Sequence, residues 1–131
     1  MIVLDTHVWI WWLDDNPCLR SDARNRIDNE SDLKISAISL LEIATACALG
    51  RLVLRPSADE WLKVAQLAER LTVEPLTASL CLESTRLPDS FHRDPADRLI
   101  VALARRLDCD LATADGKILA YPHVKTLDAR A

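Results

Sequence analysis

The feature that most constrains the fold is a short apolar run near the start of the chain that ends in a carboxylate. Ile2, Val3 and Leu4 directly precede Asp5. Three large apolar residues, two of them β-branched, are too few for a helix and typical of a buried strand. Open α/β sheets place their chemistry at the carboxyl ends of the strands. The sequence therefore predicts a buried strand with Asp5 at its functional end.

Length and composition bound the class of protein. The 131 residues fit a single domain, residues 1–131, that can bury a substantial core. With 16 basic and 20 acidic residues the net charge is −4. A polyanionic ligand would therefore have to be bound by a local group of basic residues rather than by the charge of the whole protein. The four cysteines are scattered, no basic-then-apolar leader precedes the first strand, and no apolar run is long enough to span a membrane. We expect a cytoplasmic protein with reduced thiols and no membrane association.

Segments with helical and strand patterns alternate along the chain. Helices are expected at residues 7–14, 21–30, 39–49, 58–70, 77–87 and 95–104, with a short turn or helix at 115–119. Strands are expected at residues 2–4, 33–36, 71–76, 109–113 and 124–127. This alternation predicts an α/β fold with a parallel sheet covered by helices.

Capping residues and prolines mark several boundaries. Ser39 and Glu42 form a Ser-x-x-Glu capping box for the third helix, which Gly50 closes. Asp94 as N-cap and Pro95 at the first helical position begin the helix that contains Leu99–Ala104. Because Pro75 cannot donate a hydrogen bond, the strand before it is expected to be short or at the sheet edge.

The first expected helix is apolar nearly all round. Trp9, Trp11 and Trp12 lie in it, and we expect them to fill the core and a subunit interface rather than to stack on bases. Such a helix exceeds what one side of a small core needs, so a homodimer is expected. Cys47 and Cys81 have apolar neighbours and are expected in the core.

Carboxylates recur at the places where strands end and helices begin. These are Asp5, Glu42, Asp97 and Asp115. Taken singly, Glu42 could be explained by a capping box, Asp97 by the helix dipole and Asp115 by a turn. These explanations do not account for Asp5. They also do not explain why all four acids share one edge of a parallel sheet. Mg²⁺ and Mn²⁺ favour oxygen ligands, and the set contains no imidazole or thiolate. The sequence predicts a divalent-metal site at this edge.

Four segments together resemble the PIN-domain family. They are Leu4–His7, Ser39–Ile43, Asp94–Ile100 and Leu111–Asp115, and their order and spacing are similar to those of the toxin ribonucleases of bacterial VapBC toxin–antitoxin modules. The resemblance implies a parallel sheet of order 3-2-1-4-5 flanked by helices, an RNA substrate and a VapB-type antitoxin. It also implies that Asp5, Glu42, Asp97 and Asp115 form the family's acidic quartet, whose fourth member varies. Asp94 rivals Asp97, but the spacing to Leu99 favours Asp97.

The chemistry of phosphodiester hydrolysis assigns roles to these residues. We expect Asp5 and Asp97 to be the principal ligands of Mg²⁺ or Mn²⁺, Glu42 a ligand or the holder of the attacking water, and Asp115 a ligand through water. Neighbouring hydroxyls would orient them, namely those of Thr6, Ser39 and Thr113. Basic residues flank the acids and either hold phosphates or are ordinary surface charges: Arg93, Arg98 and Lys117. Because the metal activates water, no catalytic role is expected for His7 or His92.

Two other classes of function remain open. One is a catalytically silent PIN-like module whose acids bind a partner. The other is a Mg²⁺-dependent phosphatase or phospho-receiver, which also uses an aspartate at a strand end. A haloacid-type phosphatase requires an acid two residues beyond Asp5, where this chain has His7. Cleavage that depends on metal and is lost in Asp5→Asn would identify the ribonuclease.

Overall fold

A computed structural model describes residues 1–131 and contains one parallel sheet of five strands in the order β3-β2-β1-β4-β5. The strands are β1 (Ile2–Leu4), β2 (Leu33–Ser36), β3 (Leu71–Glu74), β4 (Asp110–Thr113) and β5 (Thr126–Asp128). The expected α/β fold and strand order are confirmed. β3 lies at an edge with Pro75 directly after it, as predicted.

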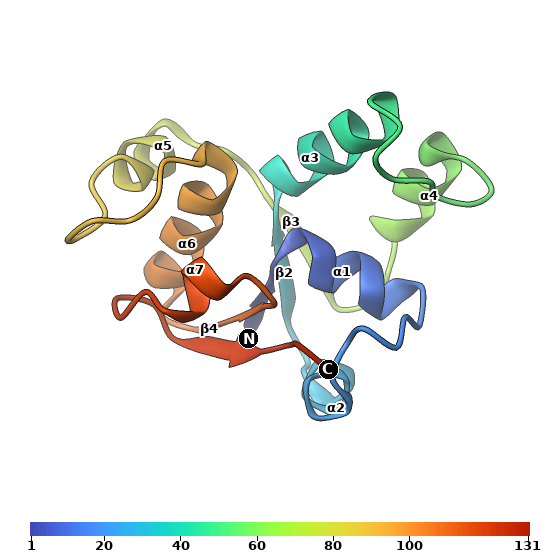
Figure 1. Ribbon diagram of the computed structural model, residues 1–131, viewed down its shortest axis with the longest axis horizontal. Coiled ribbons are helices and arrows are strands. Elements are labelled where there is room, and N and C mark those ends of the chain that lie inside the picture. Colours follow the sequence, from blue (N-terminus) through green and yellow to red (C-terminus); the bar gives the residue numbers. More distant parts are fainter.

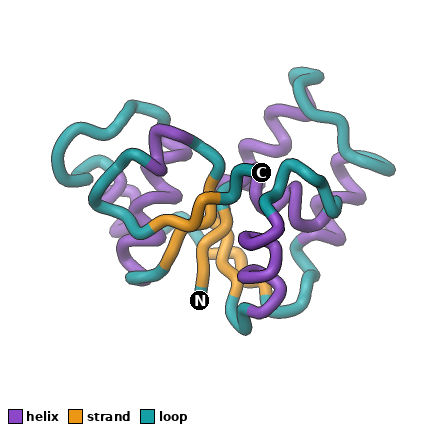
Figure 2. The backbone as a smooth tube through the Cα atoms, turned by 60° about the horizontal axis from the view of Figure 1, so that its bottom comes forward, coloured by secondary structure: helices purple, strands orange, loops and turns teal.

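Helices cover both faces of this sheet. They are α1 (Thr6–Leu13), α2 (Ser21–Asn29), α3 (Ala37–Ala48), α4 (Ala58–Ala65), α5 (Ala78–Ser84), α6 (Pro95–Leu107) and α7 (Gly116–Leu119). The first four pack against one face, and the last three against the other (Figure 1). Figure 2 shows the strands enclosed between the two helical layers. No helix has the length and apolar character needed to cross a membrane.

The central strand β1 explains why its sequence is apolar at every position. Ile2 and Leu4 face the core beneath α1–α4, whereas Val3 faces the core beneath α5–α7. All three are fully buried, because successive side chains of a strand point to opposite faces and both faces here are covered. Ile2 pairs with Leu33 of β2 and with Asp110 of β4. Asp5 is thereby placed between the ends of two neighbouring strands.

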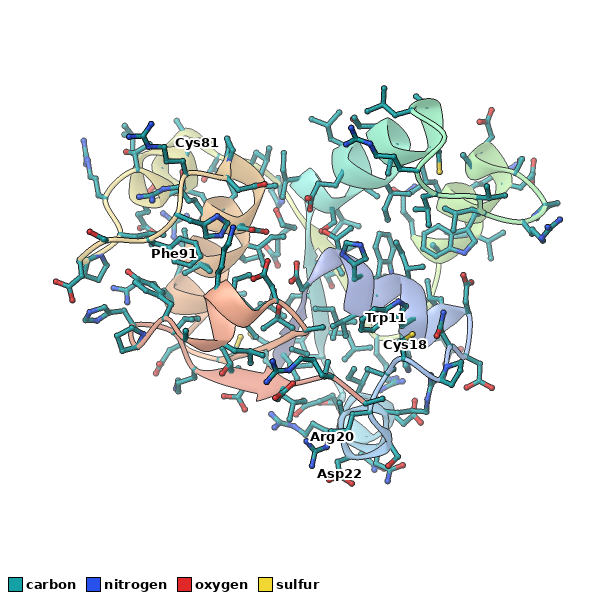
Figure 3. The ribbon with its side chains drawn as sticks, viewed as in Figure 1. Trp11, Cys18, Arg20, Asp22, Cys81 and Phe91 are labelled. Atoms are coloured by element: carbon teal, nitrogen blue, oxygen red, sulfur yellow. The ribbon has the colours of Figure 1, made fainter.

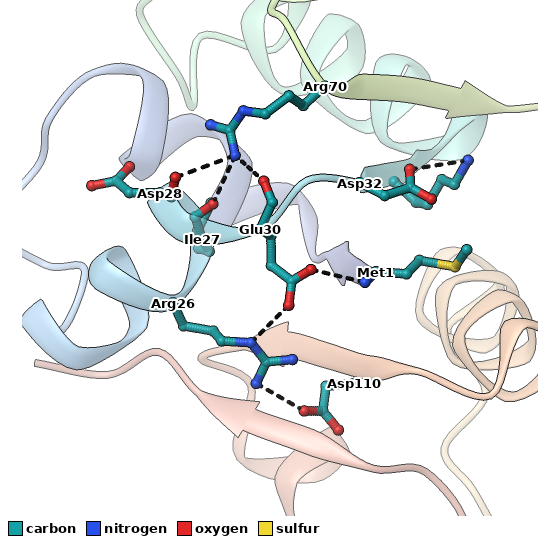
Figure 4. Close-up of polar contacts among 9 residues, drawn as sticks. Met1, Arg26, Ile27, Asp28, Glu30, Asp32, Arg70 and Asp110 are labelled. Carbon is teal, nitrogen blue, oxygen red and sulfur yellow. Dashed lines mark hydrogen bonds and ion pairs between the residues drawn. The ribbon is translucent and has the colours of Figure 1, made fainter.

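Charged groups pair with one another where the strands begin (Figure 4). Glu30 accepts from the amino group of Met1 at 2.8 Å and from Arg26 at 3.0 Å, and Arg26 also lies 3.1 Å from Asp110. Arg70 donates to main-chain carbonyls at the end of α2. At this edge of the sheet each of these acids therefore has a cationic partner.

The predicted start of α3 is wrong by one helical turn. The N-cap is Ser36, whose hydroxyl accepts from the amide of Ile38 at 3.2 Å. Ser39 lies inside the helix and makes no capping box with Glu42. Ser36 is both the last residue of β2 and a good cap, so the helix follows the strand without a loop. Gly50, with φ of 71°, lies just beyond the helix end as expected.

Other differences concern lengths and burial. α4 ends at Ala65 rather than at residue 70, because the apolar residues that follow do not reach the core: Leu67 is 77% exposed. Cys81 is exposed on α5 and Cys47 is only half-buried, contrary to the expectation that both lie in the core (Figure 3). An apolar neighbour in sequence therefore does not imply a shared face of a helix.

The tryptophans of α1 fill the core, as predicted. Trp9 is fully buried and packs edge-on against Trp61, with ring centroids 5.4 Å apart. Trp11 and Trp12 pack against the same core, and the indole N–H of Trp12 donates to Asp28 at 2.9 Å. Much of the apolar surface of α1 is thus buried against its own chain. The helix therefore offers less apolar surface for the homodimer interface that its sequence suggested.

Candidate functional site

The four acids singled out from the sequence line one cavity at the carboxyl edge of the sheet. The cavity measures about 400 Å³, and its lining includes Asp5, Glu42, Asp97 and Asp115 together with Asp94. Asp5 follows β1, and Asp115 follows β4. Glu42 comes from the second turn of α3, one turn later than expected, and Asp97 from the first turn of α6.

Asp5 and Asp115 also cap helices. Oδ1 of Asp5 accepts from the amide of Thr6 at 2.9 Å, and Oδ1 of Asp115 accepts from the amide of Lys117 at 2.7 Å. The expectation that capping plays no part at Asp5 is therefore wrong. Each bond uses one carboxylate oxygen, so capping and a second role toward the cavity are compatible.

A chain of hydroxyls connects α1 to Glu42. The hydroxyl of Thr6 donates to Oε1 of Glu42 at 2.6 Å and lies 2.8 Å from the hydroxyl of Ser39. Because Thr6 has one hydroxyl proton, which it gives to Glu42, Ser39 must donate to Thr6. Thr6 and Ser39 are both buried. These bonds fix the Glu42 carboxylate at the cavity.

Thr113 links the other two strand ends. Its hydroxyl donates to Oδ2 of Asp5 at 2.6 Å and accepts from the amide of Asp115 at 3.0 Å. The residue is fully buried. The side chain of Thr113 thus orients the carboxylate of Asp5 and also holds the backbone of Asp115 in place.

Asp94 and Asp97 differ in their environments, although both line the cavity. Oδ1 of Asp94 accepts from the amides of Ala96 and Asp97 at 2.9 and 3.1 Å, which confirms its role as N-cap. Asp94 is exposed. The side chain of Asp97 is only 15% exposed and makes no capping bond. Asp97 is therefore the more enclosed of the two, and its carboxylate is not occupied by capping the helix.

None of the four acids forms an ion pair with a lysine or arginine, in contrast to the paired acids at the opposite edge. Burial, together with the charges of Asp5, Asp94, Asp115 and Glu42, raises the pKa of Asp97 from 3.8 to about 7. Burial also raises the pKa of Asp5 and that of Glu42, partly offset by hydrogen bonds from Thr113 and Thr6 respectively. The cavity concentrates negative charge that the protein itself does not neutralise. This donor set fits a hard divalent cation.

His92 lies at the same cluster, which the sequence did not reveal. Its Nε2 is 2.9 Å from Oδ2 of Asp97, but the ring is out of line for a hydrogen bond, so this buried nitrogen has no hydrogen-bond partner. One ligand atom from each of His92, Asp97 and Asp115 falls within 4.8 Å of the other two. The placement depends on the loop before α6, for which the sequence offers no periodic pattern.

The three flanking basic residues are not alike. Arg93 and Lys117 are exposed. Arg98 instead donates to three main-chain carbonyls, those of Ser84 at 2.8 Å, Phe91 at 3.0 Å and His92 at 3.2 Å. Its Nε and Nη1 are therefore used in holding the loop that precedes α6.

Comparison with known proteins identifies the family and supports the fold. The sequence profile of the PIN domain matches residues 2–124. The chain belongs to the PIN-domain family. Ribonuclease VapC22 of Mycobacterium tuberculosis is 34% identical over 122 residues, covering 93% of this chain and 92% of that protein. The resemblance drawn from the four sequence segments is confirmed.

Solved structures share the fold of this PIN domain. VapBC2 from Rickettsia felis, bound to a DNA fragment from its promoter, superposes with a TM-score of 0.72 at 17% identity, covering 98% of this chain and 99% of that one. DNA-bound VapBC from Salmonella typhimurium gives a TM-score of 0.70 at 20% identity, covering 97% and 96%. At such identities these structures support the fold alone.

Proposed function

We propose that this protein is a ribonuclease that depends on Mg²⁺ or Mn²⁺ and acts as the toxin of a toxin–antitoxin pair. The observation that carries the proposal is the set of carboxylates that lack any lysine or arginine partner and line one cavity: Asp5, Glu42, Asp97 and Asp115. Residues 1–131 act as one domain, because both cores pack on the same sheet. The similarity to a relative named as a ribonuclease supports the choice of RNA as substrate.

Each acid has a distinct part in this proposal. Asp5 and Asp97 would hold the cation directly, Asp115 would hold it through water, and Glu42 would be a further ligand or would orient the attacking water. A bound cation of this kind lowers the pKa of its water and offsets the negative charge that develops on the phosphate. Thr6, Ser39 and Thr113 keep the carboxylates in place through the hydrogen bonds described above.

Basic residues outside the cavity receive the RNA backbone in this scheme. Arg93 and Lys117 are exposed and close in sequence to His92 and Asp115, so we assign phosphate contacts to them first. Arg98 keeps only Nη2 clear of protein acceptors, because Nε and Nη1 already donate to carbonyls. Its contribution to RNA binding is therefore smaller than that of the other two.

A VapB-type antitoxin is the proposed partner. A groove of about 430 Å³ adjoins the acids, with Ile10, Leu41 and Leu52 on its walls and Glu42 and Asp94 among its lining residues. An amphipathic segment would lay apolar residues in this groove and send an arginine or lysine toward the acids. A homodimer remains proposed, but the surface offered for it is no longer α1: it is the exposed Val53, Val64 and Leu67, which lie outside the antitoxin groove. Light scattering on the purified protein measures its oligomeric state.

The ribonuclease proposal is tested with a panel of structured RNAs, incubated with Mg²⁺, Mn²⁺ or excess chelator, followed by mapping of the cleaved ends. Asp5→Asn and Asp97→Asn should reduce cleavage more than about 100-fold, because loss of a ligand exceeds the effect of losing an outer partner. Asp59→Asn is the matched control, since Asp59 also lies in the first turn of a helix but is exposed on α4. Full activity in excess chelator would rule out the mechanism.

A further inference from the structure

We propose that His92 supplies an imidazole nitrogen to the cation that Asp97 would bind directly and Asp115 through water, and that the centre therefore favours Mn²⁺ over Mg²⁺. The inference deepens the proposed function, on which it rests only in taking the acidic cavity to be a cation site. Its basis is the juxtaposition of these three side chains, whose ligand atoms lie within 4.8 Å of one another.

The first observation is that Nε2 of His92 is buried and makes no hydrogen bond. Buried polar atoms in folded proteins nearly always have a hydrogen-bond partner. Here the nearest candidate, Oδ2 of Asp97 at 2.9 Å, is out of line for a ring N–H. In the neutral ring one nitrogen carries a lone pair and no proton. A cation shared with the carboxylates of Asp97 and Asp115 would give that lone pair a partner.

The second observation is that the backbone carrying the ring is held in place. Arg98 donates to the carbonyls of both Phe91 and His92. The ring of Phe91 packs edge-on against that of His92, with centroids 4.5 Å apart, and its centroid lies 4.6 Å from that of the Tyr121 ring. A ligand fixed in this way loses little conformational freedom when the metal binds.

A nitrogen ligand at this position changes the relative affinity of the site for Mn²⁺ and Mg²⁺. Mg²⁺ takes oxygen ligands in near-ideal octahedral geometry and keeps several waters. Imidazole is a better ligand for first-row transition metals than for Mg²⁺; Mn²⁺ also favours oxygen ligands but, as a transition metal, accepts a nitrogen among them more readily than Mg²⁺ does. Replacing one oxygen of the set by Nε2 of His92 therefore penalises Mg²⁺ relative to Mn²⁺. An all-carboxylate centre would lack this selectivity.

The test measures metal binding rather than RNA cleavage. The metal-free full chain is titrated with Mn²⁺ and, separately, with Mg²⁺, for the wild type, His92→Asn, His92→Gln and the control His123→Asn. His123 is also a histidine beside a carboxylate, with Nε2 2.6 Å from Asp89, but it lies outside the cluster of His92, Asp97 and Asp115. Loss of the ligand should weaken Mn²⁺ binding roughly tenfold or more, while Mg²⁺ binding changes much less. Thermal melts confirm that each variant is folded.

Pulsed EPR of the Mn²⁺-loaded protein provides an independent readout. Nitrogen modulation from a coordinated imidazole should be present in the wild type and His123→Asn and absent in both His92 variants. Its absence from the wild type, its loss in His7→Asn instead, or an equal change in Mn²⁺ and Mg²⁺ affinity would overturn the inference. If Mn²⁺ binds through His92 but no RNA is cleaved, only the proposed function fails. If cleavage needs metal but His92→Asn binds Mn²⁺ normally, only this inference fails.

Discussion

The hydroxyl of Thr113 donates a 2.6 Å hydrogen bond to Oδ2 of Asp5, joining residues that are 108 positions apart in the sequence. Both side chains are buried at adjacent strand ends. The bond supports the charged form of Asp5 against the burial that raises its pKa. A hydroxyl on β4 thus helps to keep the acid after β1 available to a cation.

Thr113→Val tests this support, because valine keeps the shape of threonine and removes the donor. The carboxylate of Asp5 loses a buried partner, which should cost about 1–3 kcal/mol of stability. Divalent-metal affinity should fall about 10–100-fold. Thr85→Val is the control, since the hydroxyl of Thr85 donates to the carbonyl of Leu82 at an exposed position. Unchanged metal affinity in Thr113→Val would remove this residue from the site.

Asp97→Asn should raise the melting temperature of the metal-free protein at neutral pH. The folded-state pKa of Asp97 is raised from 3.8 to about 7, so its contribution to stability is present at low pH and is lost as the pH rises toward 7. Asparagine removes that loss, and it should also abolish the further stabilisation by Mg²⁺. Thermal melts with chelator and with Mg²⁺ measure both effects.

The opposite result would assign Asp97 to the helix alone. If it only complements the dipole of α6, Asp97→Asn should cost about 0.3–1 kcal/mol and leave the effect of Mg²⁺ unchanged. In that case Asp94, on the same cavity, takes the proposed role.

Metal binding itself should weaken as the pH falls. A cation competes with the proton on Asp97, whose pKa of about 7 lies well above its ordinary value of 3.8. The apparent affinity for Mg²⁺ should therefore decrease between pH 8 and about 6. Calorimetric titrations at several pH values measure it. A pH-independent affinity in the wild type would contradict the coupling.

Ser36→Ala and Ser39→Ala separate the helix cap from the site. Ser36 caps α3, so its loss should cost about 0.5–2 kcal/mol, with little effect on metal affinity. Ser39 bonds to Thr6, which holds Glu42, so its loss should lower cleavage more than stability. Denaturant melts and RNA cleavage by both variants distinguish the roles. If Ser39→Ala left cleavage at the wild-type rate, the hydroxyl chain would have no function.

The antitoxin should inhibit by charge as well as by shape. We expect a short reading frame directly upstream to encode it, and its inhibitory segment to bring a basic residue to Glu42 and its neighbouring acids. Reversing every basic charge in that segment should restore RNA cleavage in a mixture of the two proteins, while reversing exposed acids of the same segment should not. Intact inhibition after full charge reversal would disprove this mode of binding.

The sequence predicted the sheet and the acidic edge because both follow from local patterns. An apolar run that ends in Asp5 specifies a buried strand and its functional end. The start of α3 was misplaced because Ser36 and Ser39 have the same capping chemistry, and only the path of β2 selects between them. His92 was considered only as a catalytic acid or base and not as a neighbour of Asp97, because its position depends on contacts of Arg98 and Phe91. Contacts of this kind do not produce a periodic pattern in the sequence.

The place of β1 in the sheet has a consequence for protein synthesis. β1 is translated first, yet it lies in the middle of the sheet, and Leu4 pairs with Ala112 of β4. A nascent chain therefore carries Asp5 through the synthesis of residues 6–109 before the strand that completes the cavity begins. Pairings between such distant residues form late. A polypeptide whose synthesis is cut short before residue 110 lacks β4 and the Thr113 hydroxyl that bonds to Asp5, and therefore cannot assemble the acidic centre.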